Sequence, residues 1–95
     1  MALTGKEKRA LRAQGNSLKA EVWVGKEGVS DGIVKTLLNS LNTKELVKVK
    51  ILEACPEDKK EVGAKLSEAT EAELVQVLGN TLLFYKPLPE DESDS

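Results

Sequence analysis

Histidine is absent from this chain of 95 residues, and Cys55 is its only cysteine. Without histidine, the chain lacks the usual base for nucleophile activation, the usual proton shuttle and the commonest metal ligand. A single thiol forms no internal disulfide and no cysteine-rich metal cluster, and we expect it to be idle or buried. These absences argue against an enzyme, so we expect no catalytic residue, no bound metal and no cofactor.

Aromatic residues and long apolar runs are also scarce. Trp23, Phe84 and Tyr85 are the only aromatic residues, so most of the core must consist of Leu, Val, Ile and Ala. No apolar run approaches the roughly 20 residues of a membrane-spanning helix. Residues 1–6 lack the apolar stretch of a secretion signal. We therefore expect a cytoplasmic protein that binds no membrane, and we expect a monomer.

The charges are divided unevenly along the chain. Residues 1–50 contain ten Lys and Arg against five Asp and Glu, whereas residues 51–95 contain four against eleven. Such a division is typical of a protein with a nucleic-acid-binding face in one half and an acidic segment in the other. Chance clustering of charges on solvated faces is the alternative explanation.

Capping signals and apolar spacing predict three helices. Thr4 and Glu7 have the spacing of a capping box, and Gly15 is placed to end the first helix in a left-handed cap. Ser30 or Asp31 can cap the second helix, whose apolar residues recur at helical spacing. A Pro-Glu-Asp sequence suits the opening of the third. The predicted helices cover residues 5–14, about 31–42 and about 56–69.

Alternation of apolar and polar residues predicts four strands. The clearest runs from Leu46 to Ile51, where three apolar residues face one way while Lys48 and Lys50 face the other. Gly79-Asn80 is a hairpin signal between the last two strands. The predicted strands cover residues 21–24, 46–51, 73–78 and 81–85.

This order of elements predicts a single two-layer α/β domain. Strand–helix–strand units favour parallel neighbours with right-handed crossovers, and the terminal hairpin adds an antiparallel pair. We expect a four-stranded mixed sheet with three helices that pack mainly on one face. The domain should cover residues 2–87, and residues 88–95 should form a disordered acidic tail. Such a tail either aids solubility or competes with phosphate for the basic face.

The most informative segment is Gly25-Lys26-Glu27-Gly28, which joins the first strand to the second helix. Glycine has no Cβ and reaches backbone angles that other residues avoid, so this turn lets a phosphate come close to the main chain. The amides of such a turn, followed by a helix N-terminus, form a donor site for an anion, and Lys26 adds a positive charge. The pattern predicts a clamp for a nucleic-acid backbone, although many ordinary tight turns share it.

Two further groups of residues extend this candidate interface. Cationic residues of the first helix and of the segment after it form a basic stripe: Lys6, Lys8, Arg9, Arg12 and Lys19. Lys48, Lys50 and Trp23 point away from the valines of their strands, so one sheet face could offer two cations and a ring on which a base stacks. The alternatives are an ordinary solvated helix face, and a Trp23 that is covered by the first helix or by the chain after it.

Four blocks of the sequence, in order, resemble the CRM domain: residues 3–12, 24–30, 44–50 and 72–87. The resemblance implies a fold similar to the C-terminal domain of translation initiation factor three. It also implies RNA binding, with the Gly-x-x-Gly turn working as in KH domains. Free-standing bacterial members of the family associate with precursors of the large ribosomal subunit, so the resemblance implies ribosomal RNA as the partner, with ribosomal proteins as further contacts.

We therefore interpret the chain as a non-catalytic RNA-binding protein that assists assembly of the large ribosomal subunit. An enzyme is disfavoured because the carboxylates around the third helix resemble a solvated face, with no apolar pocket to raise a pKa for acid–base work. These carboxylates are Glu57, Asp58, Glu61 and Glu68. The remaining alternative is a protein-interaction adaptor that docks on ribosomal proteins, or on another ribonucleoprotein, through a sheet edge or the acidic half without contacting RNA.

Overall fold

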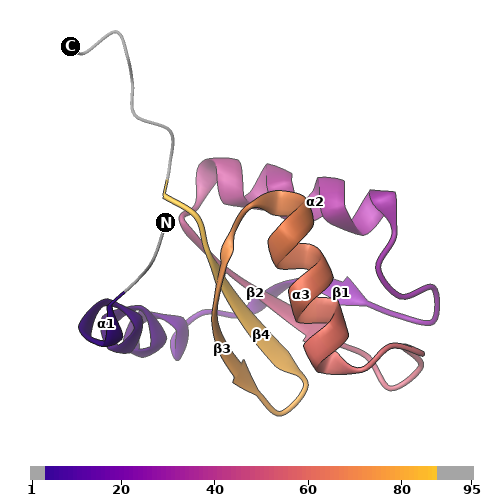
Figure 1. Cartoon of the computed structure of the whole chain (residues 1–95), viewed down its shortest axis with the longest axis horizontal. Helices are drawn as coiled ribbons and strands as arrows, with labels where there is room; N and C mark the ends of the chain where they lie inside the picture. The colour runs from indigo at the N-terminus through magenta and orange to yellow at the C-terminus, as the bar shows by residue number, and fades with distance from the viewer. Residues whose placement is uncertain (1–3, 88–95) are drawn as a thin grey trace, which may run out of the picture.

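The computed structural model describes residues 4–87, and the predicted tail at residues 88–95 lies outside the described residues. Seven elements follow one another in the predicted order (Figure 1). They are α1 (Gly5–Gly15), β1 (Ala20–Val24), α2 (Asp31–Thr43), β2 (Leu46–Ile51), α3 (Lys59–Thr70), β3 (Glu73–Leu78) and β4 (Thr81–Tyr85). The strands begin and end within one residue of their predicted bounds, because apolar alternation and the hairpin signal mark both ends clearly.

The four strands form one mixed sheet in the order β1-β2-β4-β3. β1 and β2 run parallel because α2 returns the chain between them, whereas β4 is antiparallel to both β2 and β3. Gly79 in the hairpin turn has a φ of 58°, a left-handed conformation that favours glycine. The predicted α/β fold with three helices and a four-stranded mixed sheet is confirmed.

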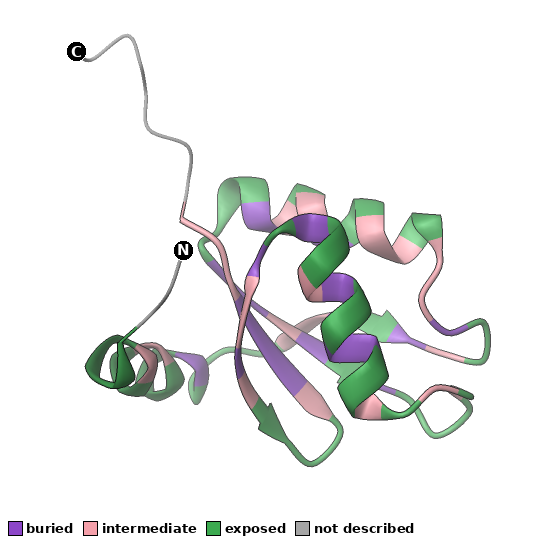
Figure 2. Ribbon diagram, viewed as in Figure 1, coloured by how far each residue is buried: buried purple, intermediate pink, exposed green. Residues whose placement is uncertain are grey.

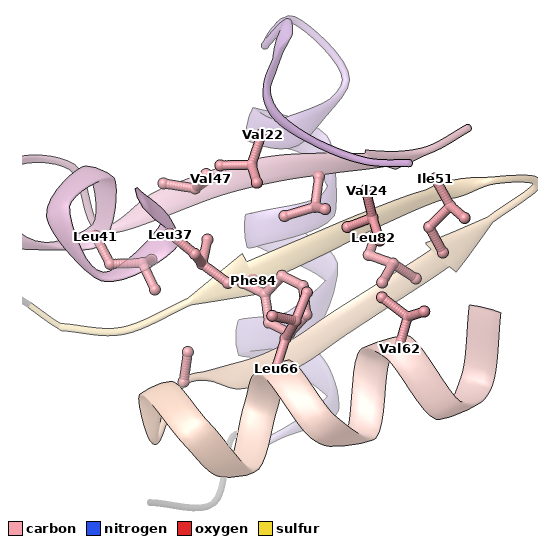
Figure 3. Close-up of a cluster of buried hydrophobic side chains, with 12 residues drawn as sticks. Val22, Val24, Leu37, Leu41, Val47, Ile51, Val62, Leu66, Leu82 and Phe84 are labelled. Atoms are coloured by element: carbon pink, nitrogen blue, oxygen red, sulfur yellow. The ribbon is translucent and has the colours of Figure 1, made fainter. Parts of the chain in front are cut away.

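Helices α2 and α3 cover one face of the sheet, and the main core lies between them and the strands (Figure 1, Figure 3). Alternate strand positions point into this core, as the pleat requires. β4 contributes the fully buried Leu82 and Phe84, which Leu37 of α2 and Leu66 of α3 meet from the helical side. Burying one such side chain contributes about 1.5–3 kcal/mol. This core therefore fixes β1 and α2, which carry the candidate site, relative to one another.

Helix α1 packs on the opposite face of the sheet, against β2, β3 and β4. Leu11 and Tyr85 pack there on a second, smaller cluster made of Leu46, Val75 and Leu83. The expectation that the helices lie mainly on one face therefore holds for α2 and α3, whereas α1 departs from it. Because the apolar stripe of α1 is short, the helix covers only part of this face.

Gly15 does not end α1 in the predicted left-handed cap. The residue lies within the helix, which is followed by Asn16 with a φ of −60°, so that prediction is wrong. Gly15 is buried, and a Cβ at this position would lie 2.6 Å from Cδ2 of Leu83. The glycine is therefore needed for the close approach of α1 to β4.

Helix α3 begins later than predicted, because Asp58 acts as its N-cap and accepts a hydrogen bond from the Lys60 N–H at 3.2 Å. Residues 52–58 consequently form a loop between β2 and α3. This loop carries Glu57 to the turn that precedes α2. At its other end, α3 stops at Glu71, which has a left-handed φ of 60°.

Within residues 4–87, no helix is long and apolar enough to cross a membrane. That same part of the chain holds no group of three or more His, Cys, Asp or Glu side chains placed to bind a metal ion. Cys55 is half-buried in the loop between β2 and α3, with its Sγ 3.6 Å from the Glu57 carbonyl oxygen.

Candidate nucleic-acid interface

The Gly-x-x-Gly turn connects the end of β1 to the start of α2 (Figure 1). The Gly28 N–H donates a hydrogen bond to the Gly25 carbonyl oxygen at 2.9 Å, which closes the turn. Gly28 has a φ of 67°, so this position favours glycine on conformational grounds. Lys26 and Glu27 stand exposed at the tip. The predicted turn is thus present, and its two central side chains face solvent.

A hollow of about 450 Å³ lies between this turn and the first turns of α2. All four turn residues line it, together with Ser30, Gly32, Ile33 and Thr36. Ser30 is the N-cap of α2, and its Oγ accepts a hydrogen bond from the Ile33 N–H at 3.3 Å. The N-terminus of a helix carries partial positive charge, and glycine, which has no Cβ, leaves the main chain accessible. The hollow therefore has the chemistry of a site for an anionic group.

Glu57 anchors the main chain directly after the turn through a hydrogen bond that its sequence neighbours do not indicate. Its Oε1 accepts a hydrogen bond from the Val29 N–H at 2.8 Å, and its Oε2 pairs with Nζ of Lys65 on α3. Its side chain is 17% exposed. The assignment of Glu57 to a solvated helix face is therefore wrong. Its partner Val29 lies 28 residues away, so no local pattern could have revealed the contact.

Both contacts act on the ionisation of Glu57. The hydrogen bond from Lys65 and, next, the amide of Val29 stabilise the carboxylate, so they lower the pKa of Glu57 from its ordinary value. In turn, the Glu57 carboxylate raises the pKa of Lys65. Glu57 and Lys65 therefore form an ion pair near neutral pH, in which Glu57 is the member that contacts the main chain next to the turn.

The basic residues of α1 lie far from the turn. Lys6, Arg9 and Arg12 are exposed and Lys8 is half-buried. In Figure 1, α1 lies at one end of the molecule and the turn between β1 and α2 lies at the other, and Figure 2 shows the outer surface of α1 largely exposed. Lys19, on the connection from α1 to β1, is also exposed. The fold therefore separates the stripe from the turn instead of joining them in one patch.

The sheet face that α1 leaves open carries the remaining candidates. The strand register places Trp23, Lys50, Thr81 and Leu78 in one row across all four strands. Trp23 is 50% exposed and Lys50 is exposed. α1 lies on this same face, but it packs against β2, β3 and β4 and leaves Trp23 half-exposed. The ring is therefore accessible beside an exposed lysine.

Lys48 differs from Lys50, although both lie on this face. Its Nζ donates a hydrogen bond to the Leu18 carbonyl oxygen at 3.1 Å, and the side chain is half-buried. This bond ties β2 to the segment that connects α1 with β1. Of the two lysines predicted on this face, Lys50 is thus an exposed cation and Lys48 is an anchored one.

Comparison with known proteins places the chain in a family. Residues 3–86 match the family model described as the CRS1 / YhbY (CRM) domain. The chain is 41% identical over 90 residues to Probable RNA-binding protein YqeI of Bacillus subtilis, and the match covers 95% of this chain and 94% of that protein. It is 44% identical over 87 residues to Probable RNA-binding protein MJ0652 of Methanocaldococcus jannaschii, covering 90% of this chain and 64% of that longer protein.

A solved structure agrees with the same assignment. The solution structure of Staphylococcus aureus protein SAV1595 superimposes with a TM-score of 0.80 at 38% sequence identity. The match covers 97% of this chain and 96% of that one. The fold, the extent of the family match and the identity to these relatives lead to one conclusion: the chain belongs to the CRS1 / YhbY (CRM) domain family.

Proposed function

We propose that this chain is a non-catalytic RNA-binding protein that captures the sugar–phosphate backbone at the turn Gly25–Gly28. The observation that carries the proposal is the hollow in which this turn meets the N-terminus of α2. The names of the relatives support RNA as the ligand, since YqeI and MJ0652 are both named as RNA-binding proteins.

The chemistry of the hollow suits a phosphate better than a neutral ligand. A phosphate there would meet the positive end of α2 and the Lys26 ammonium from the turn. Gly25 leaves room for this approach. Within 4 Å of a Cβ at that position, the one neighbouring atom would be Cδ1 of Leu52, at an ordinary contact distance of 3.7 Å. Packing inside the protein therefore does not demand glycine there, which is consistent with a glycine kept for a ligand.

The bases of the captured strand would lie along the open sheet face. β1 runs from the α1 end of the molecule to the turn, and Trp23 lies two residues before Gly25 (Figure 1). An exposed indole offers a surface for stacking a base, and Lys50 beside it offers a cation for the adjacent phosphate. A single-stranded segment is the RNA form that presents its bases in this way.

We propose further that the RNA is ribosomal RNA in precursors of the large ribosomal subunit, and that the protein acts in the cytoplasm. The support for this finer statement is the family resemblance. In this proposal the protein performs no chemistry: it holds an RNA segment while the particle matures.

Sucrose-gradient sedimentation of tagged protein from cell lysate tests the proposal. The wild-type protein should sediment with particles slightly lighter than the mature large subunit, and RNase treatment should release it. Replacing Lys26 and Glu27 by Asp should abolish this association. The matched control replaces Lys44 and Glu45, a Lys-Glu pair at the far end of α2, by Asp. The control changes the net charge equally and should still associate.

Two results would overturn the proposal. Association that survives RNase treatment and is retained with one purified ribosomal protein would favour the adaptor function. Equal association of the Lys26/Glu27 variant and the Lys44/Glu45 control would show that the turn does not contact the RNA. Thermal unfolding of both variants verifies that each remains folded.

A further inference from the structure

Glu57 occupies an unusual position for a carboxylate, against the main chain at Gly28 and Val29, where the turn that lines the proposed phosphate site ends. It reaches the turn from the loop between β2 and α3 and accepts the Val29 N–H. A Cβ at Gly28 would clash with Oε1 of Glu57, so the left-handed glycine and the carboxylate fit together as a unit. The turn thus meets two segments that lie far from it in sequence, the loop of residues 52–58 and the helix α3 that follows this loop.

A carboxylate at this position has two opposing effects on phosphate binding. Its hydrogen bond to Val29 orders the main chain that follows Gly28, which helps a turn that must present a fixed shape. Its negative charge, however, would repel a phosphate held on the other side of the turn. Lys65 resolves this conflict, because its ammonium pairs with the second carboxylate oxygen.

We propose that Glu57 is a positioning residue for RNA capture and that Lys65 neutralises it, so that the turn is held by a carboxylate without repelling the RNA backbone. The inference rests on the proposed function of the turn. It assigns the α3 side of the molecule a part in binding, although neither Glu57 nor Lys65 touches the RNA.

The lowered pKa of Glu57 agrees with this arrangement, since both of its partners favour the charged form. The geometry also explains why the carboxylate is mostly buried while Lys65 is more than half exposed. The carboxylate is fixed by the backbone contact, and the lysine reaches it along the surface of α3.

Three variants separate the charge effect from the hydrogen bond. Lys65→Met leaves the bond to Val29 but exposes the charge of Glu57, and should weaken RNA binding by roughly three- to tenfold. Lys60→Met removes an exposed cation from the same helix and is the matched control, which should change affinity much less. The double variant Glu57→Gln/Lys65→Met keeps an acceptor for Val29, removes both charges, and should restore binding close to that of the Lys60→Met control.

Amide hydrogen exchange tests the positioning part without RNA. In Glu57→Ala, the Val29 amide should exchange faster, while amides in the centre of β2 remain protected; in Glu57→Gln, protection should be largely retained. Unchanged exchange at Val29 in Glu57→Ala would overturn the positioning role.

The outcomes also distinguish this inference from the proposed function. If the wild-type protein binds no RNA, the proposed function itself fails. If the wild type binds RNA, the Lys26/Glu27 variant does not, and Lys65→Met binds as well as Lys60→Met, the turn is the site but Lys65 does not neutralise Glu57. Failure of the double variant to recover affinity would likewise overturn the neutralisation.

Discussion

At the scale of single residues, the two glycines of the turn have different physical functions. Gly28 has a left-handed φ, and a Cβ there would collide with the Glu57 carboxylate. Gly25 has neither constraint, since its φ is not left-handed and its nearest neighbour would be at an ordinary contact distance. The fold therefore requires Gly28 but places no such demand on Gly25, which in our proposal serves a ligand that comes close to the main chain.

Alanine substitutions should separate these two functions. We predict that Gly28→Ala lowers the free energy of unfolding by about 1–2 kcal/mol, because a non-glycine residue must adopt a left-handed conformation. Gly25→Ala should change it by less than about 0.5 kcal/mol and yet weaken RNA binding. Urea denaturation and titration with single-stranded RNA measure the two quantities. Gly25→Ala with full RNA affinity would show that no phosphate approaches that residue closely.

The sequence predicts the turn but not what supports it. Gly25, Lys26 and Gly28 lie within one four-residue motif, and their chemistry can be understood without knowledge of the fold. Glu57 is recognisable only in three dimensions, because its hydrogen bond to Val29 spans 28 residues. Among several carboxylates near α3, nothing local distinguishes the one that turns inward.

At the scale of elements, prediction succeeds where the periodicity is strong. The bounds of β2, β3 and β4 match the predicted ranges because apolar alternation and the Gly79-Asn80 turn mark where these strands begin and end. The face on which α1 packs could not be derived in this way. It depends on the close contact between Gly15 and Leu83, which are 68 positions apart in the sequence, and a short apolar stripe is compatible with either face of the sheet.

The end of α3 offers a test at the element scale. Glu71 adopts the left-handed conformation at the C-cap, where glycine is the favoured residue. We predict that Glu71→Gly raises the free energy of unfolding by about 0.5–1 kcal/mol. Ala64→Gly, an exposed position within the same helix, is the control and should lower it by about 1 kcal/mol. Urea denaturation measures both, and a loss of stability in Glu71→Gly would contradict the backbone argument.

At the scale of the whole molecule, the cationic surfaces lie apart. The stripe on α1 and the turn at Gly25–Gly28 occupy opposite ends, with the open sheet face between them (Figure 1). An RNA that contacts both must cross this face, past Trp23 and Lys50. Binding at the turn alone would leave the stripe without any contribution, so the salt dependence of affinity discriminates between a short and a long binding site.

We predict that a long site is used. Replacing Lys8, Arg9 and Arg12 by Ala should reduce the slope of log affinity against log salt by about 2 for single-stranded RNA, because each lost phosphate contact removes about 0.7. The control replaces Lys44, Lys59 and Lys60, which belong neither to the stripe nor to the turn, and should leave the slope nearly unchanged. Equal slopes for both triple variants would confine binding to the turn and its surroundings.

The position of β4 has a consequence for how the protein is made. Among the four strands described, β4 is the last to be synthesised, yet it lies in the middle of the sheet, between β2 and β3. Its side chains at 82–84 are all buried, and they contribute to the cores on both faces. Before β4 is translated, the nascent chain therefore contains β1, β2 and β3 but lacks the strand that joins β2 to β3 in the sheet. Because domains generally fold as units, this domain should remain unfolded and accessible to chaperones and proteases until Tyr85 emerges from the ribosome. It should then fold in a single step.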